Sequence, residues 1–186
     1  AYGKPAALLL SGLQIDEIDA DHYALLGTND VTGRWFDLSQ SLILPKGENV
    51  WLARSFDQGS PESLDPFLQN RIEVVAGNEA YELLHYDVPV LTGQELAEFA
   101  LGDGRVLLQQ ADITGSDNAE MTVVTHWQQL GDPQPLKFFI HAIAADGQLV
   151  AQWDGLGANW QGWLSGDTLI QVHTLTLPDD LPIESV

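Results

Sequence analysis

The chain has 186 residues, of which 45% are hydrophobic, and 27 acidic side chains against 7 basic ones give it a formal net charge of −20. This length and composition are enough for one ordinary folded domain or two small ones. The charge opposes approach to nucleic acid phosphates and to anionic lipid, so both are excluded as partners. The chain has no cysteine, which excludes disulfides, Cys-ligated zinc and thiol catalysis.

No apolar run approaches the roughly 18–20 residues that cross a bilayer, and no signal-peptide pattern opens the chain. The sequence begins at Ala1 rather than Met and stops at Val186, directly after a strand-like run. We therefore expect a soluble piece of a larger protein.

Residues 1–88 are predicted to form a small α+β or α/β domain. Short apolar or alternating runs predict strands at Ala6–Leu10, Ser41–Leu44, Val50–Phe56, Arg71–Val75 and Tyr81–Tyr86. Asp19–Leu26 and Pro66–Asn70 are predicted to be short helical segments. A boundary is expected near Asp87, with Gly93–Leu101 as a linker or short helix.

Residues 97–186 are predicted to form an antiparallel β-sandwich, because strand-like runs alternate there with turn clusters. The runs are Val106–Ala111, Met121–Gln128, Phe138–Ile143, Gln148–Trp153 and Thr168–Leu177. The apolar phase slips within the last run, which predicts a β-bulge near His173. The whole chain is thus expected to be α+β and mainly β.

The pair Asp146-Gly147 stands between two β-forming runs and predicts a hairpin with a two-residue type I′ loop. In that register Ala145 pairs with Gln148, His141 with Gln152, and Ile140 with Trp153. One face is then wholly apolar and includes Trp153, which we assign to the core; its members are Phe138, Ile140, Ala142, Leu149, Ala151 and Trp153. The other, mixed face carries Phe139, His141, Ile143, Val150, Gln152 and Asp154. We expect the two halves of the chain to pack together through its apolar members, Phe139, Ile143 and Val150.

Catalytic and cofactor motifs are absent from the sequence. It has no Gly-rich phosphate loop, no Gly-x-Ser-x-Gly and no His-Glu-x-x-His. Four acidic residues resemble a calcium loop by count, but the central Gly and terminal Glu of an EF-hand are missing and helix capping explains them better; they are Asp16, Glu17, Asp19 and Asp21. His126, His141 and His173 lie on strands that can be neighbours, but without ligand spacing. We expect no metal and no cofactor.

The strongest candidates for ligand contact lie at the end of the predicted hairpin. Trp160 and Trp163 stand in a Gly-rich loop, and sugars stack C–H groups on indole rings while amides and carboxylates bind their hydroxyls. The mixed face adds Asp154, Gln152 and His141. Two alternatives stay open: the indoles plug the open end of the sandwich, or the polar groups only hold the following loop.

Two further clusters have testable geometry. A soluble hydrolase needs two carboxylates facing each other across a cleft at roughly 5–10 Å, and Asp154 with Asp167 is the pair to inspect. Arg34 and Asp37 are expected to hold a turn electrostatically, while a neighbouring aromatic ring anchors the first domain. A ligand role for that cluster requires Trp35 to be exposed.

Short motifs in both halves resemble the soluble C-terminal region of bacterial protein-mannosyltransferase-like membrane glycosyltransferases, which use polyprenyl-phosphate sugars. In the second half they are Phe99-Ala-Leu-Gly-Asp-Gly-Arg-Val-Leu-Leu108, His126-Trp127, Phe139-Ile-His141, Asp146-Gly147, Gln152-Trp-Asp154, Trp163, Gly166-Asp167 and Leu175-Thr-Leu-Pro178. In the first half they are Pro5-Ala-Ala-Leu-Leu-Leu-Ser-Gly12, Arg34-Trp-Phe-Asp37 and Leu44-Pro45. In that family the region usually continues with a further strand after the Leu-Pro, and this chain lacks it.

The resemblance implies a non-catalytic accessory domain on the exoplasmic (extracellular or periplasmic) side of the membrane. No catalytic residue is carried over, because the catalytic carboxylates of that family lie in loops between membrane helices. Such a domain is expected to position a glycan, a polyprenyl-phosphate sugar or an acceptor beside the membrane portion of its parent protein. The alternative is a purely structural or protein-interaction module without a small-molecule ligand.

Overall fold

The computed structural model describes residues 7–13, 33–46, 50–56, 59–69, 71–89, 91, 95–115 and 119–178. Most of these residues lie in strands, arranged in two five-stranded sheets and a two-stranded hairpin, and the helices are single turns. This confirms the predicted α+β, mainly-β fold class. Within the described part of the chain, no helix is long and apolar enough to cross a membrane.

The first sheet has the strand order β2-β1-β4-β6-β5. Its strands are β1 (Ala7–Ser11), β2 (Gly33–Phe36), β4 (Val50–Ser55), β5 (Arg71–Gly77) and β6 (Tyr81–Tyr86). Strand β1 runs parallel to β2 and β4, whereas β6 is antiparallel to β4 and β5. The parallel strands β1 and β4 are buried along most of their length, as expected for apolar strands covered on both faces.

The second sheet has the order β3-β12-β9-β8-β7, and each neighbouring pair is antiparallel. Its strands are β3 (Ser41–Leu44), β7 (Ala97–Leu101), β8 (Gly104–Gly115), β9 (Glu120–Leu130) and β12 (Thr168–Thr176). The region expected to be a linker or short helix therefore contains β7, and β2 falls where no strand was predicted. Two single turns, η2 (Glu62–Leu64) and α2 (Asp65–Leu68), precede β5, and a third, η3 (Trp160–Gly162), precedes β12.

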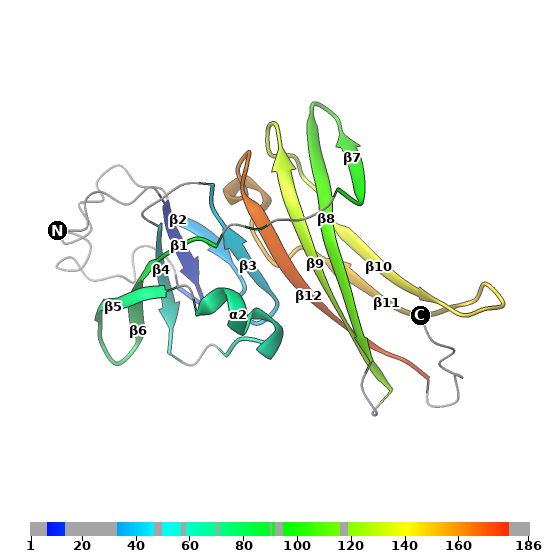
Figure 1. Ribbon diagram of the computed structural model, residues 1–186, viewed down its shortest axis with the longest axis horizontal. Coiled ribbons are helices and arrows are strands. Elements are labelled where there is room, and N and C mark those ends of the chain that lie inside the picture. The colour runs from blue at the N-terminus through cyan, green and yellow to red at the C-terminus, as the bar shows by residue number, and fades with distance from the viewer. Residues whose placement is uncertain are drawn as a thin grey trace.

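The hairpin of β10 (Phe138–Ile143) and β11 (Leu149–Gly155) covers part of one face of the second sheet. The Trp127 ring of β9 stacks on Phe138 of β10 at 4.2 Å, and Trp153 of β11 meets His173 of β12 edge-on at 4.4 Å. Strand β10 thus lies over β9 and β11 over β12. In Figure 1 the long strands β8, β9 and β12 stand between this hairpin and the first sheet.

The predicted bulge near His173 is wrong. Strand β12 pairs with β9 without a register shift from Thr168 to Thr176. Both faces of β12 are covered, by the hairpin on one side and by the first half of the chain on the other, so six consecutive residues are buried. A central strand that is covered on both faces accepts apolar residues at odd and at even positions. The change in the apolar pattern along this strand therefore requires no bulge.

The predicted pairing of the hairpin is confirmed at Ile140 with Trp153, and also at His141 with Gln152 and Ala142 with Ala151. The loop itself differs, because Gly147 donates to the Ala144 carbonyl at 2.8 Å and Ala144 donates to Gln148 at 2.9 Å. The loop is therefore three residues long and closed by Gly147 in the left-handed region, with φ of 86°. A register shift at Val150 compensates for the extra residue. Because of this shift, Leu149 pairs with Ile143 and lies on the mixed face rather than on the predicted apolar face. There it is 51% exposed.

The two halves of the chain do not pack through the mixed face, as had been expected. Phe139 and Ile143 are 60% and 62% exposed. The halves are joined instead by β3, which lies within residues 1–88 but pairs with β12 from Leu44–Thr168 to Ser41–Gln171. One core cluster runs through both halves, because β3 brings Leu42 and Ile43, both fully buried, against the second sheet.

Candidate ligand-binding site

The predicted pair of exposed indoles does not form. Trp163 is 1% exposed, packs edge-on against Phe138 at 6.2 Å, and donates its indole N–H to the Asp167 carbonyl at 3.2 Å. Trp160 is half-buried in η3. Trp163 therefore belongs to the core, in agreement with the alternative that this loop closes the end of the sandwich.

The three polar candidates lie on the outer face of the hairpin. His141 pairs with Gln152, and both are exposed. Asp154 is also exposed, with one carboxylate oxygen 3.5 Å from Lys137 Nζ. These side chains share one surface, whereas Trp163 contacts Phe138 on the inner side of the hairpin. The five predicted residues thus do not line a common site.

Asp167 is a structural residue, so the hydrolase pair with Asp154 is not formed. Its carboxylate is buried, forms an ion pair with Arg34, and accepts hydrogen bonds from the backbone N–H groups of Lys46 at 2.8 Å and Leu164 at 2.9 Å. Arg34 accordingly pairs with Asp167 and does not hold a turn with Asp37. The carboxylate of Asp37 instead accepts hydrogen bonds from Ser39 and Gln40.

Of the two aromatic residues that could anchor the first domain, Phe36 is the anchor and Trp35 reaches the surface. Phe36 is fully buried in the core cluster that joins the halves. Trp35 is 37% exposed, which meets the condition set for a ligand role, although it does not line the pocket described below.

The three strand histidines do not converge. His173 faces the hairpin, His126 faces Phe67 of α2 on the opposite side of the sheet, and His141 is exposed on the hairpin. The described residues contain no group of three His, Cys, Asp or Glu side chains able to hold a metal ion. The acidic residues weighed as a calcium loop, like the helix predicted at Asp19–Leu26, lie outside the described residues.

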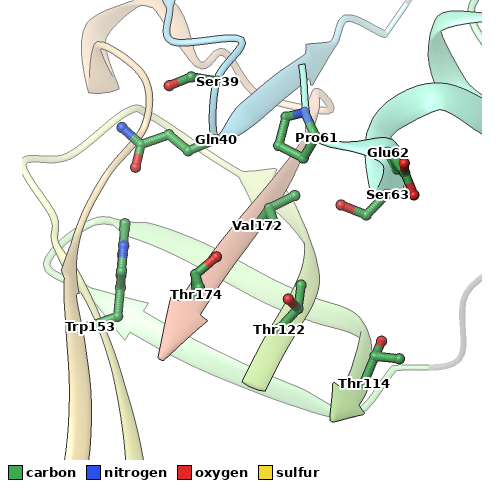
Figure 2. A pocket seen from close by; sticks show the side chains of 10 residues that line it. All are labelled: Ser39, Gln40, Pro61, Glu62, Ser63, Thr114, Thr122, Trp153, Val172 and Thr174. Atoms are coloured by element: carbon green, nitrogen blue, oxygen red, sulfur yellow. The ribbon is translucent and has the colours of Figure 1, made fainter. Parts of the chain in front are cut away.

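A pocket of about 510 Å³ lies between the first half of the chain and the second sheet (Figure 2). We call it the threonine pocket. Four separate parts of the chain line it: the turn before β3, the residues leading into and forming η2, the ends of the long strands, and Trp153 of β11. Its lining residues are Ser39, Gln40, Pro61, Glu62, Ser63, Thr114, Thr122, Trp153, Val172 and Thr174.

The floor of the threonine pocket is a row of three threonines on neighbouring strands. Thr122 of β9 is directly opposite Thr114 of β8 on one side and Thr174 of β12 on the other. Directly opposed residues in antiparallel strands project to the same face, so their three side chains point the same way. Each hydroxyl provides one hydrogen-bond donor and acceptor lone pairs, which makes the row a surface of paired donors and acceptors.

An indole and several polar groups surround this row. Figure 2 shows the Trp153 ring edge-on at one side of the pocket, with Pro61, Glu62 and Ser63 across from it. The ring lies beyond β3, where the edge of β12 is no longer paired with that strand. The pocket thus combines an aromatic surface with hydroxyl, amide and carboxylate groups, and among the described residues that line it only Glu62 is charged.

Behind Trp153, three buried side chains of the sheet are linked by hydrogen bonds, and none of them is charged at physiological pH. The Trp127 indole donates to Thr125 Oγ1 at 2.8 Å, and that oxygen lies 2.9 Å from His173 Nε2. Burial lowers the pKa of His173 to about 4, so this imidazole is neutral at physiological pH. The indole surface of the pocket is therefore backed by an uncharged ring.

Sequence reasoning missed the threonine pocket because its walls come from segments that are distant along the chain. Trp153 was assigned wholly to the core, but it packs against the core and also borders the pocket. One signal was available: Thr122 and Thr174 are in phase along their strands with apolar residues that the sheet buries, which places two hydroxyls on a largely apolar face.

Comparisons with protein-family models, with curated proteins and with solved structures gave no significant match to this chain.

Proposed function

We propose that this chain is a non-catalytic accessory domain that positions a glycan, held in the threonine pocket, for a membrane glycosyltransferase-like parent protein. The parent and the exoplasmic location come from the resemblance of the sequence motifs. The pocket is the observation that carries the binding role, because an indole, three aligned hydroxyls, an amide and a carboxylate border one cavity.

Sugar recognition uses the same groups. The C–H face of a pyranose stacks on an aromatic ring, and its hydroxyls exchange water for side-chain donors and acceptors. Trp153 offers the ring, Gln40 the amide, and Thr122 with Thr174 the hydroxyls. An open pocket of this kind desolvates little of its ligand, so we expect a dissociation constant near 1 mM, or about −4 kcal/mol.

A titration of the isolated chain with neutral mannose- and glucose-based oligosaccharides, followed by amide NMR, tests the proposal. We expect shifts at Thr122, Thr174 and the Trp153 indole. Thr174→Val keeps the shape of the side chain and removes one hydroxyl, so binding should weaken about two- to tenfold, the equivalent of one neutral hydrogen bond of about 0.5–1.5 kcal/mol.

Thr176→Val is the matched control, because Thr176 is exposed on the same strand two residues further along and does not line the pocket. Its affinity should equal that of the unchanged chain. The highest sugar concentration is about 10 mM, roughly ten times the expected dissociation constant. The absence of any shift at that concentration, or shifts confined to the outer face of the hairpin, would reject the pocket as the glycan site.

A second candidate function is protein interaction without a small ligand. It is favoured by the mixed face of the hairpin, where Phe139, Ile143 and Leu149 are all more than half exposed. Apolar side chains gathered on one face are typical of surfaces that bind another protein. Saturable sugar shifts at the threonine pocket would favour the glycan role over this one.

A further inference from the structure

Strand β10 has an unprotected edge. It pairs with β11 on one side, and among the described residues no strand pairs with its other side. Its sequence, Phe138-Phe-Ile-His-Ala-Ile143, contains no Lys, Asp, Glu, Pro or Gly. Exposed edges of natural sheets are normally protected by charged residues, proline, bulges or a covering segment, because their free N–H and C=O groups bind other strands.

An apolar groove of about 450 Å³ runs beside this edge. Strand β10 lies over β9 and β11 over β12, so part of the inner face of β7 and β8 extends beyond the hairpin; Phe99 and Ala111 are exposed there, whereas Val106 is buried. Strands β7, β8 and β9 form the floor of the groove, and β10 with the segment leading into it forms one side. The lining residues are Phe99, Val106, Leu108, Ala111, Val123, Thr125, Trp127, Leu136, Lys137, Phe138, Phe139 and Ile140. Phe99 remains 45% exposed there.

We propose that this groove binds an extended segment of a partner protein, which pairs with β10 and becomes the third strand of the hairpin sheet. Only a polypeptide in extended conformation supplies both things that the site offers: backbone groups for the edge, and alternating side chains for an apolar floor. Every second residue of the segment would be apolar and would pack against the accessible apolar members of the lining, Phe99 and Leu108.

A second copy of this chain does not fit the site. Residues of β7 and β8 line the groove beside the β10 edge, so a second copy that paired there edge to edge would have to bring its own β7 and β8 to the same side. Each copy also carries a formal charge of −20, which opposes self-association. The bound segment therefore comes from a different protein.

Charge complementarity gives the polar positions of that segment. Lys137 is the one cation among the described residues that line the groove, and it already lies 3.5 Å from an Asp154 carboxylate oxygen and 5.3 Å from the centre of the Phe139 ring. The strongly acidic chain favours lysine or arginine in its partner and disfavours acidic residues. The partner is thus an extended, basic segment with alternating apolar residues.

Amide hydrogen exchange of the full chain, measured by NMR with the synthetic peptide Lys-Val-Thr-Val-Thr-Val-Lys, tests this inference. We expect the exchange rates of the β10 amides that point away from β11 to fall about tenfold at saturation, because they become hydrogen-bonded. A peptide of the same sequence, N-methylated at alternate residues, keeps the side chains but loses backbone donors, and it should not protect these amides.

Phe99→Lys places a cation in the groove and should weaken peptide binding at least tenfold. Val74→Lys is its matched control, because Val74 is 54% exposed on β5 of the other sheet. A peptide concentration of about 2 mM is enough to populate even a weak complex, with a dissociation constant on the order of 1 mM. No protection of β10 at that concentration, or equal binding of the methylated peptide, would overturn the proposal. So would protection of β10 that rises with protein concentration without peptide, since it would identify a second copy as the occupant. None of these results depends on sugar binding at the threonine pocket.

Discussion

Asp167 is a residue of the second half whose carboxylate contacts both halves of the chain. Its carboxylate is buried and shared among Arg34 of β2, the N–H that follows β3, and the N–H of Leu164. Two charges removed from water are costly unless they are paired, and here each one offsets the desolvation of the other. Removal of either partner leaves the remaining charge buried.

We predict that Asp167→Asn destabilises the chain by about 3–5 kcal/mol, because the buried Arg34 guanidinium loses its counter-charge. Arg34→Met should cost less, about 2–3 kcal/mol, since Asp167 retains two backbone hydrogen bonds of the charge-assisted kind. Urea denaturation followed by tryptophan fluorescence measures both values.

The exposed ion pair between Arg105 and Glu98 provides the control. Its side chains are 58% and 39% exposed, so Arg105→Met should change the free energy of unfolding by less than about 1 kcal/mol. An equal effect of Arg105→Met and Asp167→Asn would show that burial of the Asp167 pair contributes nothing.

His173 should make the fold sensitive to acid. Its pKa is lowered by burial to about 4, from an ordinary value of 6.5, and burial also lowers the pKa of His126. The unfolded chain therefore binds a proton at His173 below about pH 6.5, whereas the folded chain does so only below about pH 4. The free energy of unfolding falls as the pH drops through this window, by on the order of 3 kcal/mol for His173.

We predict that His173→Gln removes most of this pH dependence, because the amide reaches Thr125 but does not titrate. Denaturation curves at intervals between pH 7 and pH 4 give the slope for each variant. His141→Gln, at an exposed position, is the matched control and should leave the slope unchanged. A slope that is the same in all three proteins would mean that other groups, such as His126 or the carboxylates, determine the acid response instead of His173.

At the scale of single elements, strong alternation made strands easy to predict. Strands β3, β6 and β10 have the predicted limits, because each is a short β-forming run that ends at a turn or a polar residue. Strand β2 contains only four residues and was hidden in a cluster of charged and aromatic side chains. Strand β7 was taken for a linker because Gly and Glu precede it, although pairing with β8 outweighs that local preference.

The hairpin shows how a correct register can come from an incorrect loop. The loop has one residue more than predicted, and the register shift at Val150 removes the difference before Ala151. The pairing was predicted from the loop, and it holds from Ala142–Ala151 onward because the bulge at Val150 cancels the extra loop residue; the loop type itself depends on the φ angle of one residue.

Gly147 is that residue, and we predict that Gly147→Ala lowers stability by about 1 kcal/mol, the approximate cost of a left-handed conformation for a residue with a Cβ. Gly115→Ala is the control: a Cβ at Gly115 would have no atom within 4 Å. Its effect should be neutral or stabilising by up to about 1 kcal/mol. Thermal melts separate the two variants by a few degrees. If Gly147→Ala melts at the same temperature as Gly115→Ala, the left-handed loop is not required.

For the whole molecule, the sequence predicted the order of the two halves but not how they are connected. Periodicity indicates which face of a strand is buried, but not which distant strand will lie beside it. The placement of β3 next to β12 and the walls of the threonine pocket both depend on such distant neighbours. This is why the fold class was predictable and the pocket was not.

We predict that the chain unfolds in a single cooperative transition, although its two parts were expected to be separate domains. Strand β3 and the Arg34–Asp167 pair couple them, and one core cluster spans both. Loss of NMR peaks from β4–β6 and from β8–β9 with increasing urea measures each half. The midpoints should coincide, and two midpoints separated by more than about 0.5 M urea would indicate independent halves.

The position of β3 also determines when the protein can finish folding during its synthesis. Strand β3 ends at Leu44, but β12, which covers it, begins only at Thr168. At about 5–20 residues per second, the ribosome needs roughly 6–25 s to make the intervening chain. During that interval Leu42 and Ile43, which are fully buried in the finished fold, have no partner strand. The nascent first half therefore presents an apolar strand that a holding chaperone can bind, and its release must await the synthesis of β12.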